Sequence, residues 1–225
     1  NFLITPTAAI ANGRQTVTIT AHLTDTFGRP FANMPITMNV GGQDNNIFPN
    51  AVQTTTASGS VTFTLSSTLA ETKAITLTDT TYETLIPIGA AEFLPSSVSA
   101  SQSSIALLSP YSTAYPDGQQ TLEFVITARD TNGNPIADAA VNVDITTGAT
   151  PNPIITSQSA PTTDENGQLF LTLQSTAPIN ARLWVIIDTV LIDQYAEANF
   201  AYAGSQQSII EVIGIDTATA DGQEL

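Results

Sequence analysis

The stretch Asp-Thr-Asn-Gly-Asn-Pro at residues 130–135 repeats the pattern of Asp-Thr-Phe-Gly-Arg-Pro at residues 25–30, at a distance of 105 residues (130 − 25). A second marker keeps this step. The turn glycines Gly13, Gly118 and Gly222 lie 105 and 104 residues apart (118 − 13 and 222 − 118). A period of about one small domain predicts domains in tandem.

The repeat divides the chain into three predicted parts: residues 1–97, residues 98–206, and residues 207–225 as the opening strand of a truncated third repeat. Each of the first two parts has about 100 residues, which is enough to bury a core of its own. The serine-rich run at residues 95–104 lies between them. Although its composition is that of a flexible linker, we expect a short, semi-rigid joint there.

Alternation of apolar and polar residues predicts β-strands in both repeats. In residues 15–24, the apolar side chains share one face, whereas the threonines and His22 share the other. Turns with glycine at residues 130–135 and 164–167 separate such strands. No window carries an apolar stripe of helical period and useful length. Many short alternating strands between turns predict an all-β fold of antiparallel β-sandwiches.

The composition excludes several classes of partner. Only 5 Lys and Arg residues stand against 20 Asp and Glu, and the formal net charge is −15. Nucleic acid and bare anionic membranes would repel such a chain. No stretch reaches 18 apolar residues, so we expect no membrane insertion in this segment. The absence of cysteine excludes disulfides and thiolate chemistry.

An ordered set of motifs in the second repeat resembles a known family. The set comprises residues 104–110, 114–118, 130–136, 163–167 and 198–200. In this order it resembles the bacterial immunoglobulin-like group 1 domain, which occurs in tandem in invasin- and intimin-type outer-membrane adhesins. The resemblance covers essentially all of residues 98–206 and is weaker over residues 1–97.

This resemblance implies tandem immunoglobulin-like sandwiches exposed outside a bacterial cell and anchored to the outer membrane through regions beyond this chain. It also implies a structural role, as a stalk or spacer that extends a distal binding domain from the cell. The partners implied are neighbouring repeats of the same protein. A cell-surface or host receptor would be bound through a tip domain that is not in this chain.

The titratable residues do not predict an enzyme. His22 is the only histidine, and alternation places it on an outward strand face. The acidic residues lie mainly in turns or at strand ends, without the paired carboxylates around a cleft that a glycosidase requires. We therefore expect no catalytic residues and no cofactor. Another reading, an accessory region of a secreted polysaccharide-acting enzyme, would need a catalytic domain elsewhere.

Calcium is the metal that this composition could bind, because hard cations prefer carboxylate and carbonyl oxygens. Weak candidates lie near the predicted domain ends, and no calcium-loop motif accompanies them. They are Asp117, Asp193 and Glu197 in the second repeat, and Asp216 and Asp221 in the third copy.

An alternative function is a ligand-binding module for a glycan or a host protein. Residues 183–187 are all apolar, so both faces of a strand there would carry apolar side chains. Trp184 and Ile186 are therefore expected on an outer sheet face, where an aromatic ring can bind a sugar or a protein. Tyr111 and Tyr115 are instead expected to pack near the joint between domains.

Overall fold

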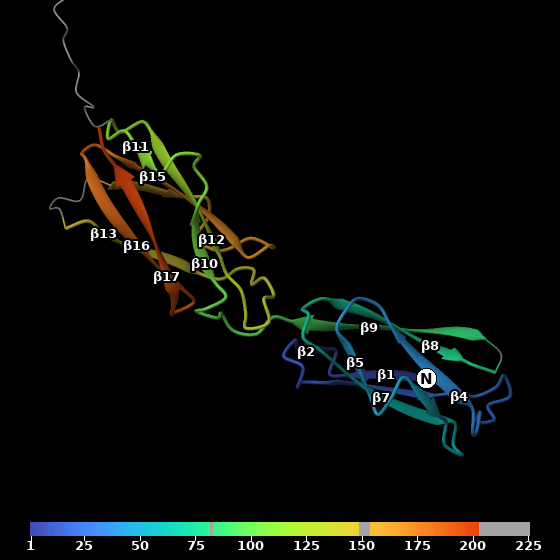
Figure 1. The fold of residues 1–225 in the computed structure, drawn as a ribbon. Coiled ribbons are helices and arrows are strands. Elements are labelled where there is room, and N and C mark those ends of the chain that lie inside the picture. Colours follow the sequence, from blue (N-terminus) through green and yellow to red (C-terminus); the bar gives the residue numbers. More distant parts are fainter. Residues whose placement is uncertain (82, 149–153, 203–225) are drawn as a thin grey trace, which may run out of the picture.

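The computed structural model describes residues 1–81, 83–148 and 154–202, which form two elongated β-bodies placed end to end (Figure 1). Every regular element in these residues is a strand. Among them, no helix has the length and hydropathy needed to cross a lipid bilayer. The predicted all-β fold class is confirmed.

The first sandwich pairs a sheet of order β1-β3-β7-β5 with a sheet of order β2-β9-β8-β4-β6. Its ladders are antiparallel except the one between β2 and β9, which is parallel. The opening segment therefore divides between the sheets. The strands are β1 (Phe2–Thr5), β2 (Ala8–Ile10), β3 (Val17–His22), β4 (Pro35–Val40), β5 (Asn45–Phe48), β6 (Val52–Thr54), β7 (Ser60–Ser67), β8 (Thr72–Asp79) and β9 (Thr84–Leu94).

The second sandwich repeats this plan, with sheets of order β10-β12-β15-β14 and β11-β17-β16-β13. Its opening segment also changes sheets, because β10 pairs antiparallel with β12 whereas β11 pairs parallel with β17. The strands are β10 (Ser104–Leu107), β11 (Thr113–Ala114), β12 (Thr121–Thr127), β13 (Val141–Thr146), β14 (Ile154–Gln158), β15 (Gln168–Ser175), β16 (Ile179–Ile187) and β17 (Val190–Phe200).

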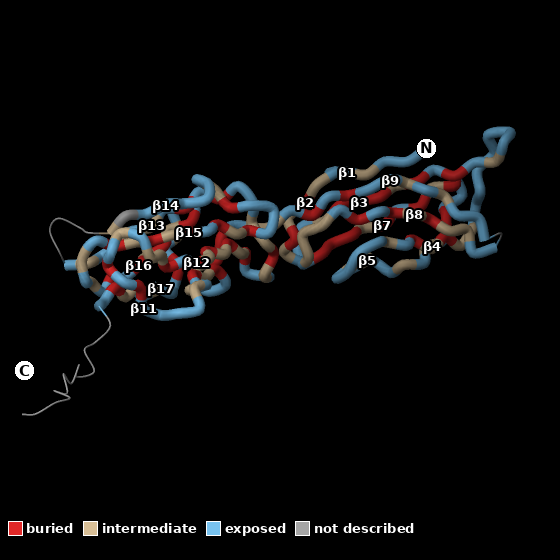
Figure 2. The backbone as a smooth tube through the Cα atoms, turned by 90° about the horizontal axis from the view of Figure 1, so that it is seen from above, coloured by how far each residue is buried: buried red, intermediate tan, exposed pale blue. Residues whose placement is uncertain are grey.

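The alternation predicted from sequence builds both cores. On β3 the inward residues Val17, Ile19 and Ala21 are fully buried, and on β12 Leu122 and Phe124 are too. Figure 2 shows buried positions running along the inside of each body. The two apolar clusters share no residue, since one draws on residues 9–93 and the other on residues 98–200. Each sandwich thus closes around its own core.

Phe93 belongs to the first core and Val98 to the second. The exact division at residue 97 stays a prediction. Residues 207–225, predicted to open a third repeat, lie outside the described residues.

Two glycines mark the same turn in the two repeats. Gly59 and Gly167 have φ angles of 77° and 71°, which glycine adopts without strain. A Cβ atom on Gly59 would lie 2.4 Å from the carbonyl oxygen of Leu23, and one on Gly167 would lie 2.5 Å from that of Ala128. The turn predicted at residues 164–167 is confirmed, and both turns require glycine for conformation and for space.

The change Gly167→Ala tests this requirement, with Gly133→Ala as the matched control. Gly133 also has a positive φ, but a Cβ atom there would meet nothing within 4 Å. We expect Gly133→Ala to cost about 1 kcal/mol of unfolding free energy, and Gly167→Ala to cost at least about 1 kcal/mol more because backbone must move. Urea unfolding followed by the fluorescence of Trp184, the chain's one tryptophan, measures both. Equal losses would contradict the steric account.

Candidate functional site: the joint between the sandwiches

The turn at residues 130–135 is organised by a buried carboxylate. Asp130 has no exposed surface. Its Oδ1 accepts hydrogen bonds from the backbone N–H groups of Asn132 (2.8 Å) and Asn134 (2.9 Å). Its Oδ2 accepts from the side-chain Nδ2 of Asn134 (2.9 Å) and from the backbone N–H of Ser96 (2.9 Å). One side chain therefore ties the turn to itself and to the linker.

The same turn reaches the first sandwich through two asparagine side chains. Asn132 Nδ2 donates to the carbonyl oxygen of Ala11 (2.8 Å). Asn134 Nδ2 donates to the carbonyl oxygen of Thr68 (2.9 Å), and Asn134 Oδ1 accepts from the N–H of Ala70 (2.8 Å). We call these contacts, together with the Ser96–Asp130 contact, the joint. Figure 1 shows this loop lying between the two bodies.

Asn134 carries the most constrained contact of the joint. It is 1% exposed, and its amide both donates to and accepts from the first sandwich. Water is excluded from this amide, so each lost bond would remove a partner from a buried polar atom of Asn134. The joint is therefore specific in orientation, as a fixed angle between the sandwiches requires.

Asp130 is charged in the joint at neutral pH. Burial acts to raise the pKa of its carboxyl group, but the hydrogen bonds from Asn134, Ser96 and Asn132 together outweigh burial and hold the pKa below its usual value. The ionised form is thus the one that the folded joint prefers.

The matching turn of the first repeat has the same frame and different side chains. Asp25 Oδ1 accepts from the N–H groups of Phe27 and Arg29 (both 2.9 Å), as Asp130 does from the two asparagines. In place of the amides, the guanidinium of Arg29 pairs with Asp25 (2.7 Å) and Phe27 is 83% exposed. Sequence reasoning identified both turns but missed their contacts. The replacement of Asn132 and Asn134 by Phe27 and Arg29 is the signal that distinguishes them.

The calcium candidates are not brought together. Asp117 Oδ1 accepts from the backbone N–H groups of Gln119 and Gln120 (both 2.8 Å), at the end where Gly118 donates to Ser175. Asp193 lies at the opposite end, where its N–H donates to Ala100.

Glu197 lies 3.5 Å from Arg182 on an outer face. In the described part of the chain no three His, Cys, Asp or Glu residues form a group suited to a metal ion. Asp216 and Asp221 lie outside the described residues, and calcium binding stays a prediction.

The predicted outer-face residues Trp184 and Ile186 do lie on the outer side of β16, half-buried, between inward neighbours that are fully buried. The ring of Trp184 lies 5.0 Å from that of Tyr195 on β17, and the guanidinium of Arg182 lies 5.4 Å from the same tyrosine ring. Glu197 in turn forms an ion pair with Arg182. We call these four side chains the outer-face cluster: Arg182, Trp184, Tyr195 and Glu197. Their ligand-binding role stays a prediction.

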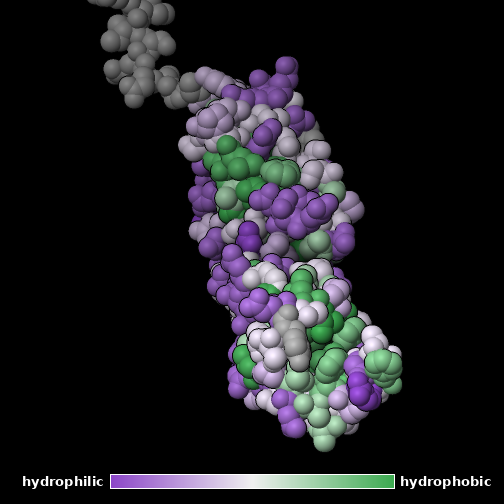
Figure 3. Space-filling model, turned by 90° about the vertical axis from the view of Figure 1, so that its right-hand side faces the viewer, coloured by the Kyte–Doolittle hydropathy of each residue, from purple (hydrophilic) through white to green (hydrophobic). Residues whose placement is uncertain are grey.

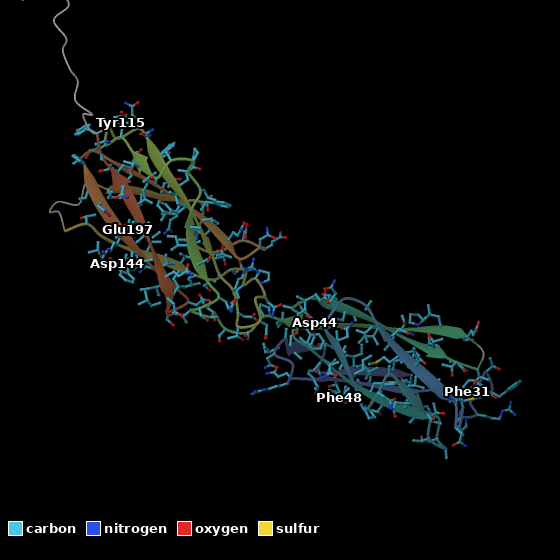
Figure 4. All side chains as sticks on the ribbon, in the orientation of Figure 1. Phe31, Asp44, Phe48, Tyr115, Asp144 and Glu197 are labelled. Atoms are coloured by element: carbon cyan, nitrogen blue, oxygen red, sulfur yellow. The ribbon has the colours of Figure 1, made fainter. Side chains whose placement is uncertain are left out.

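Two further expectations can be compared with the structure. His22 is exposed, as predicted, and its Nδ1 lies 3.1 Å from Ser60 Oγ. Tyr115 was expected near the joint, but it lies at the end of the second sandwich remote from the first (Figure 4). Tyr111 donates to the carbonyl oxygen of Thr121 in the same sandwich. The expectation of packing at this joint was wrong for Tyr115, because the turn that precedes β12 and the turn that follows it lie at opposite ends.

Comparison with known proteins agrees with this geometry. The sequence profile described as "Bacterial Ig-like domain (group 1)" matches residues 1–85 and 104–201. A comparison with curated protein sequences finds no match.

Solved structures share the fold. InvD of Yersinia pseudotuberculosis is 17% identical, with a TM-score of 0.66, over 89% of this chain and 56% of that one. The Escherichia coli adhesin FdeC is 14% identical, with a TM-score of 0.66, over 89% of this chain and 62% of that one. The chain thus spans little more than half the length of these two structures.

Acid should weaken the joint through Asp130. A carboxyl group with a lowered pKa in the folded state stabilises it fully above the unfolded value, about 3.9, and loses this contribution as the pH falls through the folded value. We expect Asp130→Asn to lose about 1.5–3 kcal/mol of stability at pH 7 and to flatten the loss below about pH 4. Asp144→Asn, on an exposed strand position, is the control. Parallel acid profiles for the wild type and Asp130→Asn, measured by Trp184 fluorescence, would contradict the assignment.

Proposed function

The chain belongs to the family of bacterial Ig-like domains (group 1), and from this premise we propose that it is a spacer segment of a bacterial cell-surface adhesin. In this role it extends a distal binding domain away from the cell. Its partners are neighbouring repeats of the same protein, and a receptor is bound by a tip domain outside this chain. The regions that anchor the protein to the outer membrane also lie outside this chain.

The observation that carries this proposal is the joint. Two sandwiches with separate cores are connected by hydrogen bonds between the side chains of Asn132 and Asn134 and the backbone of the first sandwich. Because each core is self-contained, adding repeats adds length without changing the fold of the others. A joint with a defined orientation turns this added length into reach, which a freely flexible linker would not provide.

The surface supports the same role. A formal net charge of −15 with only five Lys and Arg residues keeps the segment from adhering to anionic lipid and polysaccharide around the cell. Such a segment stays extended and available to its neighbours.

Small-angle scattering on residues 1–225, with calcium and then with a chelator, tests the spacer proposal. Strands of about eight residues at about 3.3 Å each, together with their loops, make a sandwich on the order of 40 Å long. Two sandwiches in line therefore predict a maximum dimension of roughly 80 Å. We expect this extended profile in both conditions, because protein groups alone supply the joint.

A compact particle in both conditions would overturn the spacer proposal. An extended particle that becomes flexible with the chelator would instead make acidic side chains near the domain ends calcium ligands, and would replace the joint described here as the source of stiffness.

A second candidate function, binding of a glycan or a host protein, is favoured by the outer-face cluster. Two neighbouring aromatic rings next to a guanidinium offer both an apolar surface and hydrogen-bond donors, which suit a sugar ring or a protein loop. Trp184 and Tyr195 lie on adjacent strands, so this surface is held by the sheet.

Trp184→Ala tests this second function. If the cluster binds a ligand, the change should weaken binding to a glycan array or to host-cell protein by at least about fivefold, since truncation of an aromatic side chain that carries binding costs about 1 kcal/mol or more. Phe170→Ala is the matched control, because Phe170 is 45% exposed on β15, in the opposite sheet. Equal binding by the wild type and Trp184→Ala would exclude this role.

A further inference from the structure

The free end of the first sandwich carries an open apolar pocket. It has a volume of about 330 Å³ and is lined by the ends of both sheets. Figure 3 looks onto this end, where apolar side chains gather, and Figure 4 shows Phe31 at the end remote from the second sandwich. We call it the end pocket, and its principal lining residues are Phe2, Phe31, Met34, Ile36, Asp79 and Ile86.

The second sandwich has the same positions, and there they are covered. Strand register matches Phe2, opposite Ala21, with Ile105, opposite Ile126. Phe2 is 40% exposed, whereas Ile105 is 6% exposed. The third residue of the returning strand shows the same contrast, because Ile86 on β9 is half-buried and Ile192 on β17 is 2% exposed.

The cover is the linker that precedes β10. Val98 is 9% exposed and belongs to the core of the second sandwich. The N–H of Ser99 donates to the carbonyl oxygen of Arg129 (2.8 Å), and Asp193 donates to the carbonyl oxygen of Ala100 (3.1 Å). Ser103 Oγ accepts from the N–H of Arg129 (3.0 Å) and lies 3.2 Å from its carbonyl oxygen. The linker is therefore bound as a plug across the end of its own sandwich.

The first sandwich keeps one of the two attachment points, Arg129 and Asp193, that hold this linker. Thr24 holds the position of Arg129, since both bridge to the proline of the repeated turn. None of the three linker contacts to Arg129 has a counterpart at Thr24 among the described residues. Pro87 stands where Asp193 lies and has no N–H, so the bond that Asp193 donates to the linker cannot form there.

We propose that the end pocket seats the linker of a preceding immunoglobulin-like repeat, and this inference rests on the proposed spacer function. Val98 lies six residues before Ser104, and Ser104 matches Asn1 in strand register. The occupant therefore places an aliphatic side chain six positions ahead of Asn1. The backbone of Asn1 already pairs with His22, with its terminal nitrogen 3.0 Å from the His22 carbonyl oxygen, so a chain entering there runs toward Thr24.

A chain with a copy of residues 95–103 added in front of Asn1 tests the seat. In the matched control, the change Val98→Asp is made only in the added copy, and the native Val98 stays as it is. Hydrogen exchange is read by mass spectrometry over residues 23–36 and 84–88. We expect the first extension to slow exchange there about tenfold, the effect expected from burial of one valine side chain. The second sandwich serves as the internal reference.

Three outcomes would overturn the proposal: equal exchange with both extensions, no change with either, or protection that rises with protein concentration and so indicates a second copy in the pocket. Phe31→Asp in the pocket, combined with the unchanged extension, should abolish the protection. Phe31 is 38% exposed, so the variant should fold.

Hydrogen exchange and small-angle scattering together distinguish failure of this proposal from failure of the spacer function. Protection with a compact scattering profile would keep the seat and remove the spacer role, whereas an extended profile without protection would keep the spacer role and remove the seat.

Discussion

The buried carboxylate of Asp130 is the constraint on which the arrangement of the two sandwiches depends. Its oxygens bind the N–H groups of Asn132 and Asn134, the amide of Asn134 and the N–H of Ser96. These bonds orient both asparagine amides toward the first sandwich and hold the linker beside them. A buried charge is tolerated only where hydrogen bonds replace its hydration. Here that requirement and the orientation of the joint are met by the same contacts.

The joint is built for this pair of sandwiches rather than for any pair. At the joint, the first sandwich donates the N–H of Ala70 to Asn134 Oδ1. Ala70 follows a turn in which Ser67 Oγ donates to the carbonyl oxygen of Leu69. The second sandwich repeats that turn with Ser175 and Ala177, but Pro178 follows and has no N–H to donate. A turn docking there would need other contacts. If further sandwiches flank this pair, as proposed, their joints would differ from this one, and the replacement of asparagine in the first repeat's own turn leads to the same expectation.

Much of the fold could be predicted from the sequence, because alternation and turn chemistry act locally. The inward faces of β3 and β12 and the glycine turns are confirmed. The joint could not be derived in this way, since an amide such as that of Asn134 gains its partners only when two separate cores meet. Lys73 is a second example. It shares the inward parity of β8 with Ile75, and it is fully buried because Glu71 (2.6 Å) and a backbone carbonyl accept its hydrogen bonds. A local pattern does not contain such partners.

The most direct test of a fixed joint is the distribution of distances between the two sandwiches. The chain has no cysteine, so Thr62→Cys on β7 and Asn142→Cys on β13 introduce two unique sites for nitroxide labels, both at exposed strand positions. Pulsed electron–electron double resonance should give one narrow distribution of distances between the two labels. This distribution should broaden when Asn132→Ala and Asn134→Ala are added. A distribution that is already broad without these two changes, or one that stays narrow with them, would contradict the account.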